Sequence, residues 1–133
     1  MTNQEYIENN AFQPDTRHGN LFTDSNGTMF SYGYHYPLLF KVNELNFINT
    51  IGYSNTTAKH ISYARPMAQY EVHIPYNNSD ISPLAIQKAL IEERAYIFER
   101  IAEIKRKNTK KEQGFRDRIS KIEDTLIELD KTL

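Results

Sequence analysis

Three tyrosines alternate along one short stretch of the sequence. Tyr32, Tyr34 and Tyr36 are separated by Gly33 and His35. In an extended strand such alternate positions share one face, so the three phenols would lie on one face if a strand runs through them. Rings placed in this way can stack on unpaired bases or anchor a protein interface. They can also build the core of a small domain with their hydroxyls at its rim, and the sequence leaves both interpretations open.

A second group of polar residues lies around Thr57. The run before it is rich in residues that cap helices and precedes AKHISYA, so a short helix is expected to begin near Thr57. Thr56, Thr57 and His60 would then surround the positive end of that helix, where a phosphate or carboxylate can bind. The alternative is local capping, in which His60 reaches back to the helix start and no ligand is needed.

Basic residues gather in the last third of the chain. Between residues 105 and 121, eight Lys and Arg face only Glu112 and Asp117, which leaves a local excess of six positive charges. Such a block can follow a nucleic-acid backbone, with an affinity that falls steeply as salt rises, or it can be the solvated tip of a helical hairpin. The residues considered for binding are Lys105, Arg106, Lys107, Lys110, Lys111, Arg116 and Arg118.

No pattern of catalytic or metal-binding residues accompanies these groups. The four histidines show none of the spacings typical of zinc sites, and the chain has no cysteine. The nucleophile elbow, the phosphate-binding loop and the dinucleotide fingerprint are also absent. The sequence therefore predicts a binding protein without catalytic activity, cofactor or metal ion.

The elements that must position these groups divide the chain in two. Thirteen of the sixteen Phe and Tyr lie before residue 81. The charge changes at the same place, from seven acidic and four basic residues to ten acidic and twelve basic ones. We therefore expect an α+β protein, with a small, mainly antiparallel β domain over residues 1–80 and an amphipathic helical arm over residues 81–133.

Turn signals subdivide the first part into short strands. Residues 1–19 show little periodicity and are expected to be irregular. Beyond them, Asn26-Gly27 and the segment 43–45 each separate two β-rich runs, and Asn-Gly is a strong hairpin signal because both residues tolerate positive φ. The four predicted strands, joined as two hairpins, are Leu21–Asp24, Thr28–Gly33, Pro37–Val42 and Asn46–Ile51.

One helix and one more strand are expected to complete this domain. Pro66 would end the helix that begins near Thr57, because proline cannot continue the helical hydrogen bonding. Gln69–Ile74 then alternates polar and apolar residues, which is typical of a half-buried strand. The expected order of elements is ββββαβ.

The arm begins with Ser82 and Pro83, a helix cap followed by proline at the first helical position. Asn108 and Thr109 resemble the end of one helix and the start of another, which favours an antiparallel hairpin. One unbroken helix would instead imply a coiled-coil dimer. In either arrangement a narrow apolar stripe at heptad spacing must bury against another helix or a partner. This stripe, considered for self-association, comprises Phe115, Ile119, Ile122, Leu126 and Leu129.

The chain shows no segment expected to direct it to or through a membrane. MTNQEYIENN lacks the basic start and apolar run of a secretory signal, and no apolar stretch approaches the roughly 18 residues that a bilayer requires. Together with the absence of cysteine, these features are expected of a protein of the reducing cytoplasm.

A longer pattern joins the tyrosines to the Thr57 region. It consists of S-Y-G-x-x-x-P-L from Ser31 to Leu38, Asn49, and Y-S-x-T-T-x-x-H from Tyr53 to His60. On these residues the segment 28–64 resembles a small domain of unknown function that recurs in proteins of bacteriophages and other mobile elements. The insertion of Tyr34 to Tyr36 and the helical arm depart from that domain. The resemblance implies a phage setting, in which small accessory proteins often disable host machinery, including CRISPR effectors, or assist phage replication and transcription.

These observations predict a phage-type accessory protein that acts in a bacterial host cell. It would inhibit a host defence nuclease, such as a CRISPR effector, by protein contact through the tyrosines, the Thr57 helix and the basic block. One alternative is a nucleic-acid-binding protein of phage replication or regulation. Another is a structural protein that forms homodimers through the helical arm.

Overall fold

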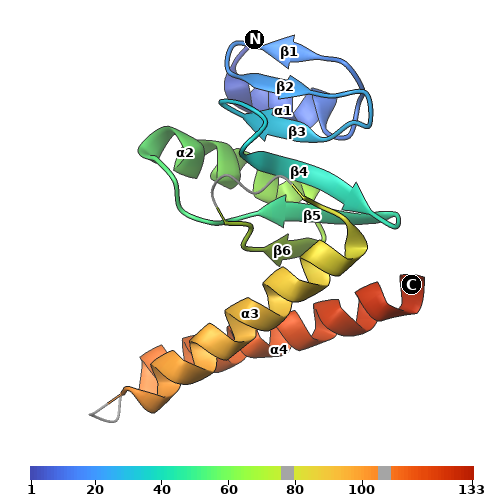
Figure 1. Ribbon diagram of the computed structural model, residues 1–133. Helices are drawn as coiled ribbons and strands as arrows, with labels where there is room; N and C mark the ends of the chain where they lie inside the picture. The colour runs from blue at the N-terminus through green and yellow to red at the C-terminus, as the bar shows by residue number, and fades with distance from the viewer. Residues whose placement is uncertain (76–79, 105–108) are drawn as a thin grey trace. The chain divides into compact units, whose positions relative to one another are not determined.

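A six-stranded sheet organises the first part of the chain in this computed structural model, which describes residues 1–75, 80–104 and 109–133. The strands lie in the order of the sequence, and all neighbours pair antiparallel except β5 and β6 (Figure 1). A parallel pair needs a crossover connection, which the helix α2 provides. The strands are β1 Arg17–His18, β2 Leu21–Thr23, β3 Met29–Ser31, β4 Pro37–Val42, β5 Leu45–Asn49 and β6 Tyr70–Val72.

The first predicted hairpin is confirmed between β2 and β3. The Asp24 carboxylate accepts hydrogen bonds from the N–H groups of Asn26 (2.9 Å) and Thr28 (3.0 Å), which closes the turn. Gly27 has a φ of 80°, and a side chain there would begin 2.5 Å from the carbonyl oxygen of Phe12. The turn therefore requires glycine for its backbone conformation and for this close approach.

The second hairpin, between β4 and β5, is also confirmed, but its turn is shorter than expected. Only Asn43 (φ 48°) and Glu44 (φ 69°) form it, and Leu45 already pairs with Val42 in the sheet. Positive φ at both central residues matches the twist of the flanking strands, which favours a two-residue turn.

The expectation of an irregular N-terminal segment is wrong, because Asn3–Asn10 form the helix α1. Thr2 Oγ1 accepts the N–H of Glu5 (3.1 Å), while the Glu5 carboxylate accepts the N–H of Thr2 (3.3 Å). This reciprocal pair is a capping box, and its T-x-x-E pattern is present in the sequence. The strand β1, which follows, was also not predicted.

The helices α1 and α2 (Asn55–Ala64) lie on the same face of the sheet and enclose its core (Figure 1). A short 3₁₀ turn, η1 (Arg65–Met67), follows α2, in agreement with the prediction that Pro66 ends the helix. The core residues come from both helices, four strands and the loop before β4, and are Tyr6, Ile7, Leu21, Met29, Tyr36, Leu38, Leu39, Ile48, Ile61 and Ala64.

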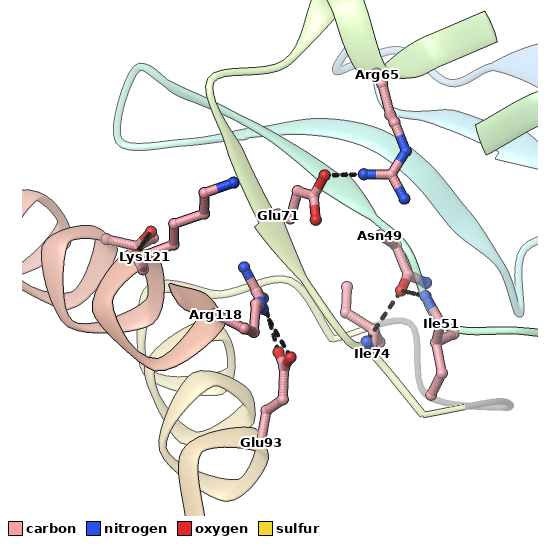
Figure 2. Close-up of polar contacts among 9 residues, drawn as sticks. Asn49, Ile51, Arg65, Glu71, Ile74, Glu93, Arg118 and Lys121 are labelled. Carbon is pink, nitrogen blue, oxygen red and sulfur yellow. Dashed lines mark hydrogen bonds and ion pairs between the residues drawn. The ribbon is translucent and has the colours of Figure 1, made fainter. Parts of the chain in front are cut away.

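Asn49, at the end of β5, links the residues that follow the paired strands β5 and β6. Its buried side-chain oxygen accepts hydrogen bonds from the N–H groups of Ile51 (3.2 Å) and Ile74 (3.0 Å) (Figure 2). The predicted strand Gln69–Ile74 is confirmed as β6, which is shorter than expected. Asn49 thus provides a hydrogen-bond acceptor for two backbone N–H groups, one before and one after the crossover, that lie beyond the ends of the paired strands.

Residues Pro83–Leu133 form a separate compact unit of two helices, whereas Met1–Ser82 form the first unit. The helices α3 (Pro83–Ala102) and α4 (Thr109–Thr132) pack against each other as a hairpin, so the alternative of one unbroken helix is excluded (Figure 1). In α4, Ile119, Ile122 and Leu129 are buried and Phe115 and Leu126 are half-buried. The apolar stripe is therefore covered within the chain, and its burial does not require a second copy. No helix of the described segments is both long and apolar enough to cross a membrane.

Candidate functional site

No strand runs through the three tyrosines, so the condition for a shared tyrosine face is not met. The strand β3 ends at Ser31, and Tyr32 and Gly33 take positive φ values of 68° and 137°. The N–H of Tyr36 then donates to the carbonyl oxygen of Gly33 (3.2 Å), which closes a turn. Residues Tyr32–Tyr36, here called the tyrosine loop, therefore project from the sheet. A positive φ is uncommon for tyrosine, and such strain is often found at functional sites.

Tyr36, the last residue of the tyrosine loop, is buried and is not available for binding. Its hydroxyl donates to the carbonyl oxygen of Ile51 (2.7 Å), and burial raises the pKa of this phenol. Its ring stacks on that of the exposed Tyr53, at 5.9 Å between ring centres. Tyr36 thus fixes the tyrosine loop to the segment that leads into α2.

Tyr34 is the most exposed member of the tyrosine loop, with 65% of its surface accessible. Its ring stands edge-on against both Phe22 and Phe30, at 5.0 Å from each ring centre. Phe22 and Phe30 are themselves stacked at 5.3 Å across β2 and β3. A large exposed ring that is already held by two buried rings loses little conformational freedom on binding, as an interface anchor requires.

Tyr32 lies over His60, with 6.0 Å between their ring centres. His60 is buried, its Nδ1 is 2.8 Å from the hydroxyl of Ser31, and its Nε2 is 3.5 Å from the Asn3 amide. Burial lowers the pKa of His60. The expectation that His60 caps its own helix is therefore wrong, because its partners lie on β3 and α1. His60 therefore packs against the Tyr32 ring of the tyrosine loop.

The helix α2 begins two residues earlier than predicted, and its N-cap is Ser54. The N–H of Thr57 donates to the hydroxyl of Ser54 (3.1 Å), and the Thr57 side chain is buried, so it cannot meet a ligand. Thr56 and His60 do come together, at a cavity of about 420 Å³ between the two helices of this unit. Its lining consists of Thr2, Asn3, Gln4, Thr56, Lys59, His60 and Tyr63.

Because His60 is buried and neutral, we expect the free energy of unfolding to decrease as the pH drops below neutrality. Since the folded protein holds the pKa of His60 below its unfolded value of about 6.5, the unfolded chain binds the proton first. Neutral His60 makes its full contribution to the free energy of unfolding above about pH 6.5. This contribution is lost as the pH falls further, by at most about 1.4 kcal/mol per pH unit.

Urea unfolding of the wild-type chain and of His60→Gln between pH 5 and 8 tests this prediction. Glutamine can occupy a similar position but does not titrate, so we expect the pH dependence to be shallower in the variant. The other histidines contribute equally to both proteins. Parallel curves for the two proteins would show that His60 does not resist protonation.

A second cavity, of about 290 Å³, opens beside the tyrosine loop. Tyr32 and Tyr34 line it together, although they do not lie on one strand. Sequence reasoning missed the other residues of this cavity, because Arg17 is brought to Phe22 only by the pairing of β1 with β2. The cavity, here called the tyrosine pocket, is lined by Arg17, Asn20, Phe22, Tyr32, Gly33 and Tyr34.

The structure describes only part of the predicted basic block. Lys105, Arg106 and Lys107 lie outside the described residues, and Lys110 and Lys111 are exposed at the start of α4. Arg116 pairs with Glu112 at 3.0 Å. Arg118 makes two hydrogen bonds of 2.8 Å to the Glu93 carboxylate, an ion pair that joins α4 to α3 (Figure 2). Arg118 is thus a structural residue of the hairpin.

Within the described residues, no group of three or more His, Asp or Glu side chains could hold a metal ion. Comparisons with protein-family models, with curated proteins and with solved structures find no match to this chain. The tyrosine loop and the tyrosine pocket are therefore the features from which function must be argued.

Proposed function

We propose that this chain is a non-catalytic accessory protein that binds a host protein through the tyrosine loop. Given the phage-type pattern over residues 28–64, its partner would be a defence nuclease such as a CRISPR effector, which it inhibits by contact. One observation carries this proposal: Tyr34 is exposed while two buried phenylalanine rings hold it in place. Tyrosines at such positions contribute a large share of the binding energy in protein interfaces.

Charge supports a protein partner over a nucleic acid. Residues 1–80, which contain the tyrosine loop, have seven acidic side chains and four basic ones, and this excess of negative charge repels a phosphate backbone. Two arginines of the basic block, Arg116 and Arg118, already pair with carboxylates. The electrostatic surface that nucleic-acid binding needs is therefore weaker than the sequence suggests.

Tyr34→Ser is expected to abolish most of the inhibition. In a plasmid-challenge assay, cells with an active CRISPR system that express the wild-type chain should retain the targeted plasmid. Loss of a hot-spot ring should weaken binding by about 30-fold, and plasmid retention should fall accordingly. Tyr96→Ser is the matched control, because Tyr96 on α3 is equally exposed, at 60% against 65%, but lies outside the tyrosine loop.

Three results would count against the proposal. The wild-type chain could fail to protect the plasmid from every system tested, or Tyr34→Ser could protect as well as the wild type. The third is tight binding to free single- or double-stranded nucleic acid with an affinity that falls steeply as salt rises. That result would favour a role in phage replication or regulation.

A further inference from the structure

Arg17 is held at the edge of the tyrosine pocket in a geometry that leaves its donors available. Its guanidinium carbon lies 4.8 Å from the centre of the Phe22 ring. The pairing of β1 with β2 places these two residues opposite each other. Stacking of this kind directs the N–H groups of the guanidinium outward, at its rim. One weak bond, from Nη1 to the carbonyl oxygen of Gly19 (3.5 Å), uses a single donor.

No carboxylate of the described residues forms an ion pair with Arg17. Elsewhere in the first unit Arg65 pairs with Glu71, and Lys41 lies over the ring of Phe12. Arg17 is therefore a cation that is positioned by the fold, lines a cavity and lacks an anionic partner in the part of the chain that is described. A guanidinium binds a carboxylate or a phosphate through two parallel hydrogen bonds, which are among the strongest that it makes.

The walls of the tyrosine pocket add an apolar component. Phe22, Tyr32 and Tyr34 contribute rings, and Gly33 contributes no side chain, so its backbone can be approached closely. The volume of about 290 Å³ is near the lower end of ligand sites, which suits one or two side chains. An occupant that satisfies both components carries an anionic group at one end and apolar atoms at the other.

We propose that the tyrosine pocket takes a carboxylate of the protein partner, presented by an Asp or Glu beside an apolar or aromatic residue. The carboxylate pairs with Arg17, and the apolar group packs on Tyr34 and Phe22. This inference rests on the proposed function. A protein carboxylate brings one negative charge to Arg17, whereas a nucleic acid brings many to a unit that is itself acidic, so the charge balance favours a protein.

Small probes test the pocket without knowledge of the partner. Benzoate carries a ring and a carboxylate, benzamide is its neutral counterpart, and uridine monophosphate represents a nucleotide. Each is titrated into the ¹⁵N-labelled full chain while the backbone amide resonances of Asn20, Gly33 and Tyr34 are followed. We expect benzoate to shift these resonances and to bind about 5- to 20-fold more tightly than benzamide.

Arg17→Met should remove the preference for benzoate over benzamide, since methionine keeps apolar bulk but no charge. Lys59→Met is the matched control, because it removes another cation of the same unit outside the tyrosine pocket, and it should keep the preference. The amide spectra also report whether each variant is folded. Arg17→Lys, which keeps the charge but not the two-pronged geometry, should restore only part of the preference.

Equal binding of benzoate and benzamide would overturn the inference, as would a preference that survives Arg17→Met or the absence of any shift. Tighter binding of uridine monophosphate than of benzoate would assign the pocket to a nucleotide instead. Loss of inhibition in Tyr34→Ser combined with no carboxylate preference would refute this inference while the proposed function stands. A carboxylate preference without inhibition of any defence system would refute the proposed function alone.

Discussion

Asn49→Leu is expected to lower the free energy of unfolding by about 2–4 kcal/mol, since each buried group left without a partner costs about 1–3 kcal/mol. Leucine is similar in size but leaves the N–H groups of Ile51 and Ile74 without the acceptor that now satisfies both. Urea unfolding followed by near-ultraviolet circular dichroism measures the effect. Eight of the nine tyrosines lie in the first unit, so the signal reports its tertiary structure.

Two further variants make this prediction specific. Asn49→Asp keeps the acceptor oxygen and replaces an amide nitrogen that has no hydrogen-bond partner among the described residues. Because burial of a charged carboxylate would itself cost stability, the variants are compared at a pH that keeps this carboxyl protonated, where Asn49→Asp should lose less stability than Asn49→Leu. Asn9→Leu makes the same change at an exposed position of α1 and should leave stability within about 0.5 kcal/mol of the wild type. If Asn49→Leu were as stable as Asn9→Leu, the hydrogen bonds of Asn49 would not hold the crossover in place.

Glu93→Ala is expected to destabilise the helical hairpin by about 3 kcal/mol. The Glu93 side chain is only 6% exposed and that of Arg118 only 18%, so removal of the carboxylate leaves a largely buried guanidinium without this partner. Thermal unfolding followed by far-ultraviolet circular dichroism, which reports helix content, measures the loss.

The double variant Glu93→Leu/Arg118→Leu should regain most of the lost stability, because it removes both charges and restores apolar volume. Glu112→Ala is the matched control. It breaks an exposed pair with Arg116 one turn away in α4 and should cost no more than about 0.5 kcal/mol. A double variant as unstable as Glu93→Ala, or a Glu112→Ala variant equally unstable, would show that burial does not set the strength of the Glu93–Arg118 pair.

The tyrosine loop differs from the arrangement that a continuous strand through the three tyrosines would give. The alternation would set Tyr32, Tyr34 and Tyr36 on one face if a strand ran through them, but the chain reverses because Tyr32 and Gly33 adopt positive φ. The reversal separates the three side chains: Tyr34 is exposed, Tyr32 stacks on His60 and Tyr36 is buried. Strain at Tyr32 has no signature in residue type, since Tyr normally avoids this conformation.

The sequence by itself determined the local elements of this protein. Asn26-Gly27, the β-rich runs around residues 43–45, Pro66 and Pro83 are signals that act within a few residues, and they placed both hairpins and the starts or ends of two helices. The heptad stripe in α4 likewise indicated burial against another helix or a partner, and α3 packs against α4. The helix α1 was missed although Thr2 and Glu5 mark its start, because its polar composition hides the two residues that it buries, Tyr6 and Ile7.

Only the tertiary structure decided how distant residues meet at the candidate site. His60 reaches Ser31 and Asn3 across 29 and 57 positions of sequence. Arg17 and Tyr34 line one cavity only because β1, β2 and β3 pair in the sheet. It also turned Arg118 from a residue of a basic block into the partner of Glu93, 25 positions away. Local patterns report the preferences of the backbone and the period of burial, whereas contacts between distant residues depend on how the elements pack, which no short window of sequence contains.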